Sequence, residues 1–351
     1  MKKFSKILIE LSKWDRCKVP IYNACASGKR IPIIKTLLSS ICINECKYCA
    51  LRRGRVAPRE RWNINKLVDI TLKLWKRGLI EGLFLSSSVY SDPEVVVEDE
   101  IEVARMLRER GFTGYIHLRL MPATPKFLIW EAAEVADRIG VNLESMDPSI
   151  FYDIAPDKGD YRLDLLDVLE ECYSIWRELG GRRNVLRAGV DTQVIIGVGE
   201  TDETTIRATY DLISRFKLKR IYYSPFEPVP NTPLEKRPQC PQYRATLLYQ
   251  IFFLIRDYGF KLEEILPLLD DHGMLPPVGD IKKEYAKKNP DLYPVDLKNA
   301  SREEILRVPG IGPRLADKII NLRESGRLSK YELVSIMGLK RAKSVMKYVV
   351  L

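Results

Sequence analysis

The sequence predicts an α/β fold built on a parallel sheet, followed by a small all-helical domain. Six strand-like apolar runs alternate with helix-like stretches whose apolar residues recur every three to four positions. This alternation is typical of parallel strands joined by right-handed helical crossovers. After residue 294 the sequence carries no strand signal and favours four short helices. The alternation alone does not separate a doubly wound sheet from an incomplete barrel.

The elements follow one another in a regular order. Residues 1–30 are expected to be an N-terminal extension with one helix, Phe4–Trp14, and irregular chain after it. The expected strands are Ile33–Ser39, Gly82–Ser86, Gly114–Leu120, Gly140–Leu143, Thr192–Ile196 and Arg220–Ser224. The expected helices between them are Ile64–Arg77, Pro93–Arg110, Pro125–Ile139, Leu163–Leu179 and Glu203–Phe216.

After residue 225 the strand and helix alternation ends. Prolines crowd residues 225–241 and predict an irregular crossing, after which helices are expected at Tyr243–Tyr258 and Ile281–Lys288. The predicted organisation is therefore an extension (1–30), a core (31–235), a helical linker region (236–293) and a C-terminal domain (294–351).

Composition and charge narrow the class of protein. The 351 residues are 46% hydrophobic and 30% charged, which is typical of globular rather than disordered chains. No apolar run reaches the roughly 18 residues that a membrane span needs, and the N-terminus lacks the apolar core of a signal peptide. We therefore expect a cytoplasmic protein. The net charge of +10 favours a polyanionic partner.

Three of the seven cysteines are crowded together directly after the first expected strand, at Cys42, Cys46 and Cys49. Disulfides are disfavoured in a reducing cytosol, so such a cluster indicates a metal site or catalysis. One alternative is a helix that buries three small side chains on one face. Another is a zinc site, which would need a fourth ligand such as Cys17, Cys25 or a histidine. Three thiolates suit a 4Fe–4S cluster better, because one iron then stays open for another ligand.

The spacing Cys-x3-Cys-x2-Cys, with Tyr48 before the third cysteine, resembles the signature of radical S-adenosylmethionine (SAM) enzymes. The resemblance covers roughly residues 31–235. It implies a partial (β/α)6 barrel, a 4Fe–4S cluster on Cys42, Cys46 and Cys49, and SAM bound at the open iron. Reductive cleavage of SAM would then give methionine and a 5′-deoxyadenosyl radical. Catalytic groups are expected at the C-terminal strand ends, as in full barrels.

The resemblance also implies a SAM-binding set. The family's Gly-Gly-Glu motif is absent here, and Ser86 and Ser87 stand at that strand end. Glu144 follows the fourth strand and could accept hydrogen bonds from ribose. Gln193, Gly197 and Gly199 resemble the glycine-bearing strand whose backbone contacts adenine. Just after the cysteines, a basic run over residues 52–61 is either solvated or guides phosphate groups to the site.

The C-terminal segment Ala300–Ile320 reads as two helices joined by a tight turn. Gly310 and Gly312 are expected to supply positive φ and a bare backbone for a phosphate, with Arg314 and Lys318 adding charge. The segment resembles the helix-hairpin-helix motif, which holds a nucleic-acid backbone without reading its sequence. A degenerate second copy follows at Ile336–Lys343.

A narrower resemblance covers nearly the whole chain. It is carried by Ile80–Ser87, Gly114–Leu118, Ala155–Lys158, Tyr222–Phe226 and Val308–Gly312. These segments look like radical SAM proteins assigned to DNA modification or repair and associated with a uracil-DNA-glycosylase-like partner. This implies radical chemistry on a nucleotide in DNA, with an electron donor for the cluster. Two alternatives stay open: a tRNA- or RNA-modifying radical SAM enzyme, and a DNA-binding iron–sulfur protein that binds no SAM.

Overall fold

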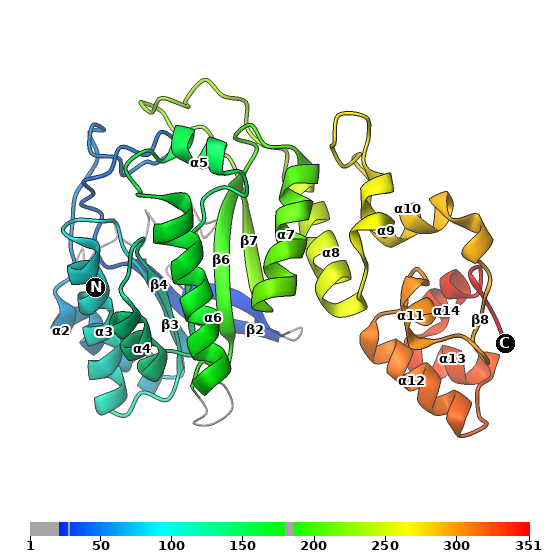
Figure 1. Ribbon diagram of the computed structural model, residues 1–351. Coiled ribbons are helices and arrows are strands. Elements are labelled where there is room, and N and C mark those ends of the chain that lie inside the picture. Colours follow the sequence, from blue (N-terminus) through cyan, green and yellow to red (C-terminus); the bar gives the residue numbers. More distant parts are fainter. Residues whose placement is uncertain (1–20, 27–28, 180–184) are drawn as a thin grey trace. The chain divides into compact units, whose positions relative to one another are not determined.

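The computed structural model describes residues 21–26, 29–179 and 185–351. The described chain forms two compact units (Figure 1). The first contains the residues up to Glu200 together with Arg215–Cys240, and the second contains Thr201–Ser214 and Pro241–Leu351. The helix expected at Phe4–Trp14 lies outside the described residues.

The first unit is built on one seven-stranded sheet in the order β1-β2-β3-β4-β5-β6-β7. The six strands from β2 onward are parallel and form a half-barrel, as predicted. Strands β1 and β7 lie at the two ends of the hydrogen-bonded order, so the barrel is open. The strands are β1 (Ile21–Ala26), β2 (Lys29–Leu37), β3 (Gly82–Ser86), β4 (Tyr115–Leu120), β5 (Arg138–Val141), β6 (Gly189–Ile196) and β7 (Arg220–Pro225).

Strand β1 corrects the expectation of irregular chain over these residues. It runs antiparallel to β2, with Ile21 opposite Ile34 and Ala26 opposite Lys29. The segment has little apolar alternation of its own, so it is the neighbouring strand that makes it extended.

Helices of the first unit surround the half-barrel (Figure 1). They are α2 (Ile64–Lys76), α3 (Pro93–Glu109), α4 (Lys126–Val135), α5 (Pro148–Ile154), the π-helix η2 (Tyr161–Leu166) and α6 (Asp167–Leu179). Several begin at side-chain caps, such as Asn63 before α2 and Asp147 before α5. The helix expected over Pro125–Ile139 ends earlier, at Val135. The Asp137 side chain accepts a hydrogen bond from the Ile116 amide of β4, which places this part of the chain beside β4 at the start of β5.

The second unit is helical. Its helices are α7 (Asp202–Phe216, of which residues 202–214 belong here), α8 (Gln242–Tyr258), α9 (Leu262–Ile265), α10 (Ile281–Lys288), α11 (Arg302–Arg307), α12 (Pro313–Glu324), α13 (Lys330–Met337) and α14 (Leu339–Val345). The last four match the four short helices predicted for the tail. The expectation of no strand there was wrong, since β8 (Val295–Asp296) pairs with β9 (Val349–Val350). Two-residue strands are too short to show any periodicity.

None of the helices within the described ranges combines the length and apolar character that a bilayer span requires.

Candidate functional site

The cysteines lie in a long loop that leaves β2 and contains neither helix nor strand before α2. An isolated bridge between Ser39 and Arg61 closes the base of the loop. Its interior is tied to neighbouring strand ends and helices, for example by the Ile43 amide to the Val89 carbonyl at 2.8 Å. The helical alternative for the cysteine segment is therefore wrong, and the loop has a defined shape.

The Arg59 side chain holds this loop together from inside. Its Nη1 donates to the carbonyls of Ser40 at 2.7 Å and Leu51 at 2.6 Å. Its Nη2 donates to the carbonyls of Arg52 at 2.7 Å and Arg55 at 3.1 Å. One planar guanidinium thus satisfies four backbone acceptors that lie on both sides of the third cysteine.

Other arginines of the 52–61 run are also bound within the protein. Arg52 pairs with Glu45 at 2.5 Å, Arg55 donates to the Ala50 carbonyl, and Arg61 pairs with Asp99. These arginines stabilise the loop, which neither of the two expectations for the basic run anticipated.

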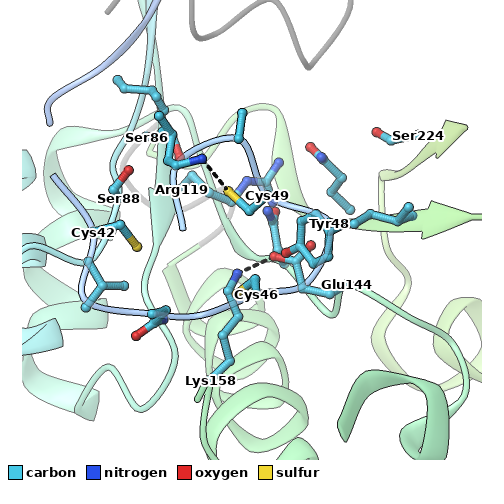
Figure 2. A pocket seen from close by; sticks show the side chains of 18 of the residues that line it. Cys42, Cys46, Tyr48, Cys49, Ser86, Ser88, Arg119, Glu144, Lys158 and Ser224 are labelled. Carbon is cyan, nitrogen blue, oxygen red and sulfur yellow. Dashed lines mark hydrogen bonds and ion pairs between the residues drawn. The ribbon is translucent and has the colours of Figure 1, made fainter. Parts of the chain in front are cut away.

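All three cysteines of the loop line a single cavity of about 240 Å³ (Figure 2). Each is a free thiol. Burial raises the pKa of Cys46 to about 12 and that of Cys49 to about 11. The protein alone therefore keeps these two thiols protonated at neutral pH, and a metal that binds them must displace their protons.

Within the described part of the chain, no three His, Cys, Asp or Glu side chains stand close enough together to hold one metal ion. A zinc ion needs a closed set of ligands, with sulfur at about 2.3 Å from the metal. A cubane cluster instead places its three cysteine ligands on three separate irons. The three thiols of Cys42, Cys46 and Cys49 lie on one loop and fit the ligand set of such a cluster.

The remaining cavity wall is formed by residues at the C-terminal ends of the parallel strands and in the loops after them. These include Leu37 on β2, Ser86 on β3, Arg119 on β4, Asn142 after β5, Gln193 on β6 and Ser224 on β7. The structure thus brings four predicted residues, Ser86, Ser87, Glu144 and Gln193, to the same cavity as the cysteines.

Glu144 is the most constrained of these predicted residues. Its φ of 60° lies in the left-handed region, and its backbone is bonded to β6 by the Glu144 amide to the Gln193 carbonyl and the Ile195 amide to the Glu144 carbonyl. Its buried carboxylate pairs with Lys158 (Figure 2), and burial together with the charge of Glu144 raises the pKa of Tyr48. Burial lowers the pKa of Lys158, but the charge and hydrogen bond of Glu144, together with Cys46 and Cys49, outweigh it, and the net shift is upward. Lys158 was not predicted as a site residue.

Gly197 and Gly199 do not line this cavity. Gly197 has a φ of 89°, and a Cβ there would come within 2.4 Å of the Cys240 Cβ. Its amide and that of Val198 donate to the carboxylate of Glu200. Close packing and loop geometry thus account for the glycine at position 197.

A buried polar network that the sequence analysis missed lies inside the half-barrel. Arg119 donates from Nη1 to Asp191 Oδ1 at 2.8 Å, and His117 Nε2 lies 3.2 Å from Asp191 Oδ2. Burial opposes ionisation of Asp191, but Arg119 and His117 lower its pKa to about 2. Burial lowers the pKa of His117 to about 4, so the imidazole is neutral at pH 7. Gly140 leaves room for Asp191, since a Cβ there would meet its carbonyl at 2.0 Å.

A second candidate site lies in the C-terminal unit. The turn between α11 and α12 adjoins a groove of about 1000 Å³ lined by Gly310, Gly312 and Arg314, with Lys282 from α10 and Arg341 from α14. Gly310 has a φ of 88°, as predicted. The expectation for Gly312 was wrong, because it caps α12 with a φ of −111°.

Gly312 is required for a different reason. A Cβ at this position would come within 3.0 Å of the Tyr258 hydroxyl. Lys318 is exposed but does not line the groove.

The C-terminal site matches a known family model, and the chain is similar to several solved structures. Residues 295–322 match the family model of the helix-hairpin-helix motif. The chain is similar to the FeFe-hydrogenase maturase HydG from Carboxydothermus hydrogenoformans, with 16% identity over 97% of this chain and 85% of that chain, and a TM-score of 0.50. No curated protein sequence matches the chain.

Two further structures are similar to a lesser degree. A second HydG structure has 15% identity over 72% of this chain and 52% of that chain, with a TM-score of 0.49. The radical SAM methyltransferase TsrM from Kitasatospora setae, whose structure contains cobalamin and a [4Fe–4S] cluster, has 16% identity over 64% of this chain and 44% of that chain, with a TM-score of 0.44. This chain thus spans about half the length of these two proteins.

At this identity the likeness to the C. hydrogenoformans HydG shows the fold. The fold of the first unit is the partial (β/α)6 barrel found in radical SAM enzymes, so the predicted fold class is confirmed. The protein joins this partial barrel and a helix-hairpin-helix motif in one chain.

Proposed function

We propose that this chain is a radical SAM enzyme, with one 4Fe–4S cluster on Cys42, Cys46 and Cys49 and SAM in the adjoining cavity. The observation that carries the proposal is that the three thiols of one loop line a cavity at the C-terminal ends of parallel strands. Such a cluster, reduced by an electron donor, would supply reductive cleavage of SAM to methionine and a 5′-deoxyadenosyl radical.

Residues of this chain provide the rest of the proposed SAM subsite. The Asn142 Oδ1 atom is buried and has no hydrogen-bond partner, and Asn142 lies two residues before Glu144. A buried acceptor without a partner is costly, at about 1–3 kcal/mol, so a ligand hydroxyl would stabilise it. Asn142 and Glu144 would together accept the ribose hydroxyls of SAM. Ser86 and Ser87, with small side chains, allow the amino acid end of SAM a close approach to β3.

The substrate is proposed to be a nucleic acid, and DNA in particular. A helix-hairpin-helix motif and a net charge of +10 favour a polyanionic partner. A target base inside a duplex would have to be flipped out to reach a cavity of this kind. The choice of DNA over RNA rests on the family resemblance described for the sequence.

The resemblance also supplies the proposed partners and location. These are an electron donor for the cluster, a uracil-DNA-glycosylase-like protein, and the cytoplasm as compartment. Co-purification of a tagged chain with and without nuclease treatment would test the glycosylase-like partner, and its absence from both preparations would contradict it.

The substrate proposal is tested by 5′-deoxyadenosine formation with different nucleic acids. The cluster is reconstituted anaerobically, reduced with dithionite and supplied with SAM and duplex DNA, single-stranded DNA or structured RNA. We expect DNA to stimulate formation of 5′-deoxyadenosine more than RNA does. Stimulation by RNA alone would replace DNA with RNA, and equal rates without nucleic acid would remove the nucleic-acid substrate.

A further inference from the structure

Lys282 on α10 is a buried lysine that contacts the tip of the helix-hairpin-helix turn. The residue is only 8% exposed. Its Nζ donates a hydrogen bond to the carbonyl of Ile311 at 2.6 Å. The ammonium also lies 4.8 Å from the centre of the Tyr258 ring. Ile311 stands between the two glycines of the turn, so Lys282 binds the turn at its centre.

The hydrogen bond from Lys282 to the Ile311 carbonyl fixes the direction of a backbone N–H group in the turn. In a trans peptide the carbonyl and the following N–H point in opposite directions. Fixing the Ile311 carbonyl on Lys282 therefore fixes the Gly312 N–H toward the other side of that peptide plane. The N–H groups of Gly310 and Gly312 have no acceptor within the described residues, and Gly310 is exposed. Free N–H groups of this kind suit an anion.

The surroundings of Lys282 lower the pKa of its ammonium group. Burial, opposed by Asp280 and aided to a smaller extent by Arg307, lowers the pKa of Lys282 to about 7. The cation–π contact with Tyr258 favours the charged form. The charged and titratable groups that face Lys282 or line its groove are Arg256, Asp257 and Tyr258 on α8, Asp280 before α10, Arg307 on α11, Arg314 on α12 and Arg341 on α14.

We propose that Lys282 is a positioning residue that holds the Ile311 carbonyl so that the Gly312 N–H, beside that of Gly310, faces a nucleic-acid phosphate. This rests on the proposed nucleic-acid function of the motif. The charged ammonium binds the carbonyl more strongly than the neutral amine does, and it adds a positive charge beside the phosphate. Phosphate binding therefore favours the protonated form, and affinity falls as the pH rises through neutrality. If binding raises the pKa of Lys282 by one unit, the loss is about tenfold.

The test measures binding of a fluorescent duplex DNA oligonucleotide to the full chain by anisotropy, at constant ionic strength, between about pH 6 and pH 8.5. We expect wild-type affinity to fall roughly tenfold over this range. Lys282→Arg, which keeps its charge, binds with a flat profile, and Lys282→Met binds weakly at every pH. Lys283→Met, an exposed neighbour on the same helix, keeps the wild-type profile. The same pH dependence in wild type, Lys282→Arg and Lys282→Met would overturn the proposal.

A second measurement separates this inference from the proposed function. Hydrogen exchange of the Ile311 amide, which donates to the Val308 carbonyl at 3.1 Å within the turn, is compared between wild type and Lys282→Met without any nucleic acid. Faster exchange in Lys282→Met supports the positioning role, and equal exchange overturns it. If wild type binds neither DNA nor RNA while exchange still differs, the nucleic-acid function fails and the role of Lys282 in the turn stands.

Discussion

The carboxylate of Glu144 and the ammonium of Lys158 form a buried ion pair beside the cysteine loop (Figure 2). The Glu144 side chain is 4% exposed and that of Lys158 17%. Glu144 also adopts a left-handed backbone conformation, which costs about 1–3 kcal/mol for a residue with a side chain. Neighbouring strand β6 holds this conformation through two backbone hydrogen bonds. A strained, buried and ion-paired carboxylate is typical of a functional site.

Removing either half of this pair should have different consequences for stability and binding. Lys158→Met leaves the Glu144 carboxylate buried without its cation, which we expect to reduce the free energy of unfolding by about 3 kcal/mol. Glu144→Gln should weaken SAM binding to the reconstituted protein about tenfold, because an amide is a poorer acceptor for ribose hydroxyls than a carboxylate. Urea unfolding and equilibrium dialysis measure the two effects.

The double variant Glu144→Gln/Lys158→Met provides the control. It should recover most of the stability that Lys158→Met loses, while SAM binding stays weak. Equal destabilisation by Lys158→Met and by the double variant would show that the pair contributes nothing by its charge.

Arg59 should be needed for loading of the cluster although it touches no cysteine side chain. Arg59→Ala removes four hydrogen bonds to loop carbonyls, so the loop loses the shape in which its thiols share one cavity. We expect the iron and sulfide content after reconstitution to fall by more than about half, since the thiols must be preorganised to bind. Arg53→Ala is the matched control, because Arg53 is exposed and pairs only with Glu45 in the ion pairs of the described chain. Equal iron contents in the two variants would contradict this role.

Glu100 on α3 should make the first unit less stable as the pH rises. Its side chain is fully buried, neither carboxylate oxygen has a partner, and burial raises its pKa well above the ordinary value. Above about pH 4.5 the unfolded chain loses this proton while the folded chain keeps it, so stability falls with pH. Glu100→Gln, which cannot ionise, should exceed wild type by about 2 kcal/mol near pH 7.5 and by less at pH 5.

Tryptophan fluorescence during urea unfolding measures this difference, because all five tryptophans lie at or before residue 176. Glu98→Gln, on the exposed side of the same helix, should follow wild type at each pH. A constant difference between Glu100→Gln and wild type across the pH range would mean that Glu100 is ionised in the fold.

Gly140 should tolerate no side chain. A Cβ at this position would lie 2.0 Å from the Asp191 carbonyl oxygen and 2.3 Å from its Oδ1. Gly140→Ala must therefore displace the strand or the Arg119–Asp191 pair, and we expect a loss of more than about 3 kcal/mol by urea unfolding. Gly54→Ala, which meets only the flexible Glu45 carboxylate at 3.2 Å, should cost less than about 1 kcal/mol. A mild effect at Gly140 would show that β5 and β6 can shift apart.

Features that depend on short segments of the sequence were predicted. The contacts between residues far apart in the sequence were not. The strand and helix alternation and the turn at Gly310 are properties of short segments, and both are found as predicted. The pairing of His117 and Arg119 with Asp191 joins residues more than 70 positions apart. It depends on the register of β4, β5 and β6, which a single sequence does not specify.

Little in the sequence indicated that Arg59 and Lys158 belong to the site. Arg59 belonged to a basic run that resembled a solvated or phosphate-guiding surface, and nothing in its spacing indicates four carbonyl partners. Lys158 follows a proline and an aspartate in a loop, where a lysine is usually exposed. Both become recognisable only once the loops are placed next to each other.

The central claim is that this barrel holds a cluster on Cys42, Cys46 and Cys49 that cleaves SAM. Its most direct test is the formation of 5′-deoxyadenosine from SAM by the anaerobically reconstituted, dithionite-reduced chain, compared with Cys42→Ala and with Cys172→Ala, a buried cysteine outside the loop. We predict that Cys172→Ala forms as much 5′-deoxyadenosine and methionine as wild type does. Cys42→Ala should form neither product. A wild-type chain with full iron and sulfide content that forms no 5′-deoxyadenosine, with or without nucleic acid, would contradict the claim.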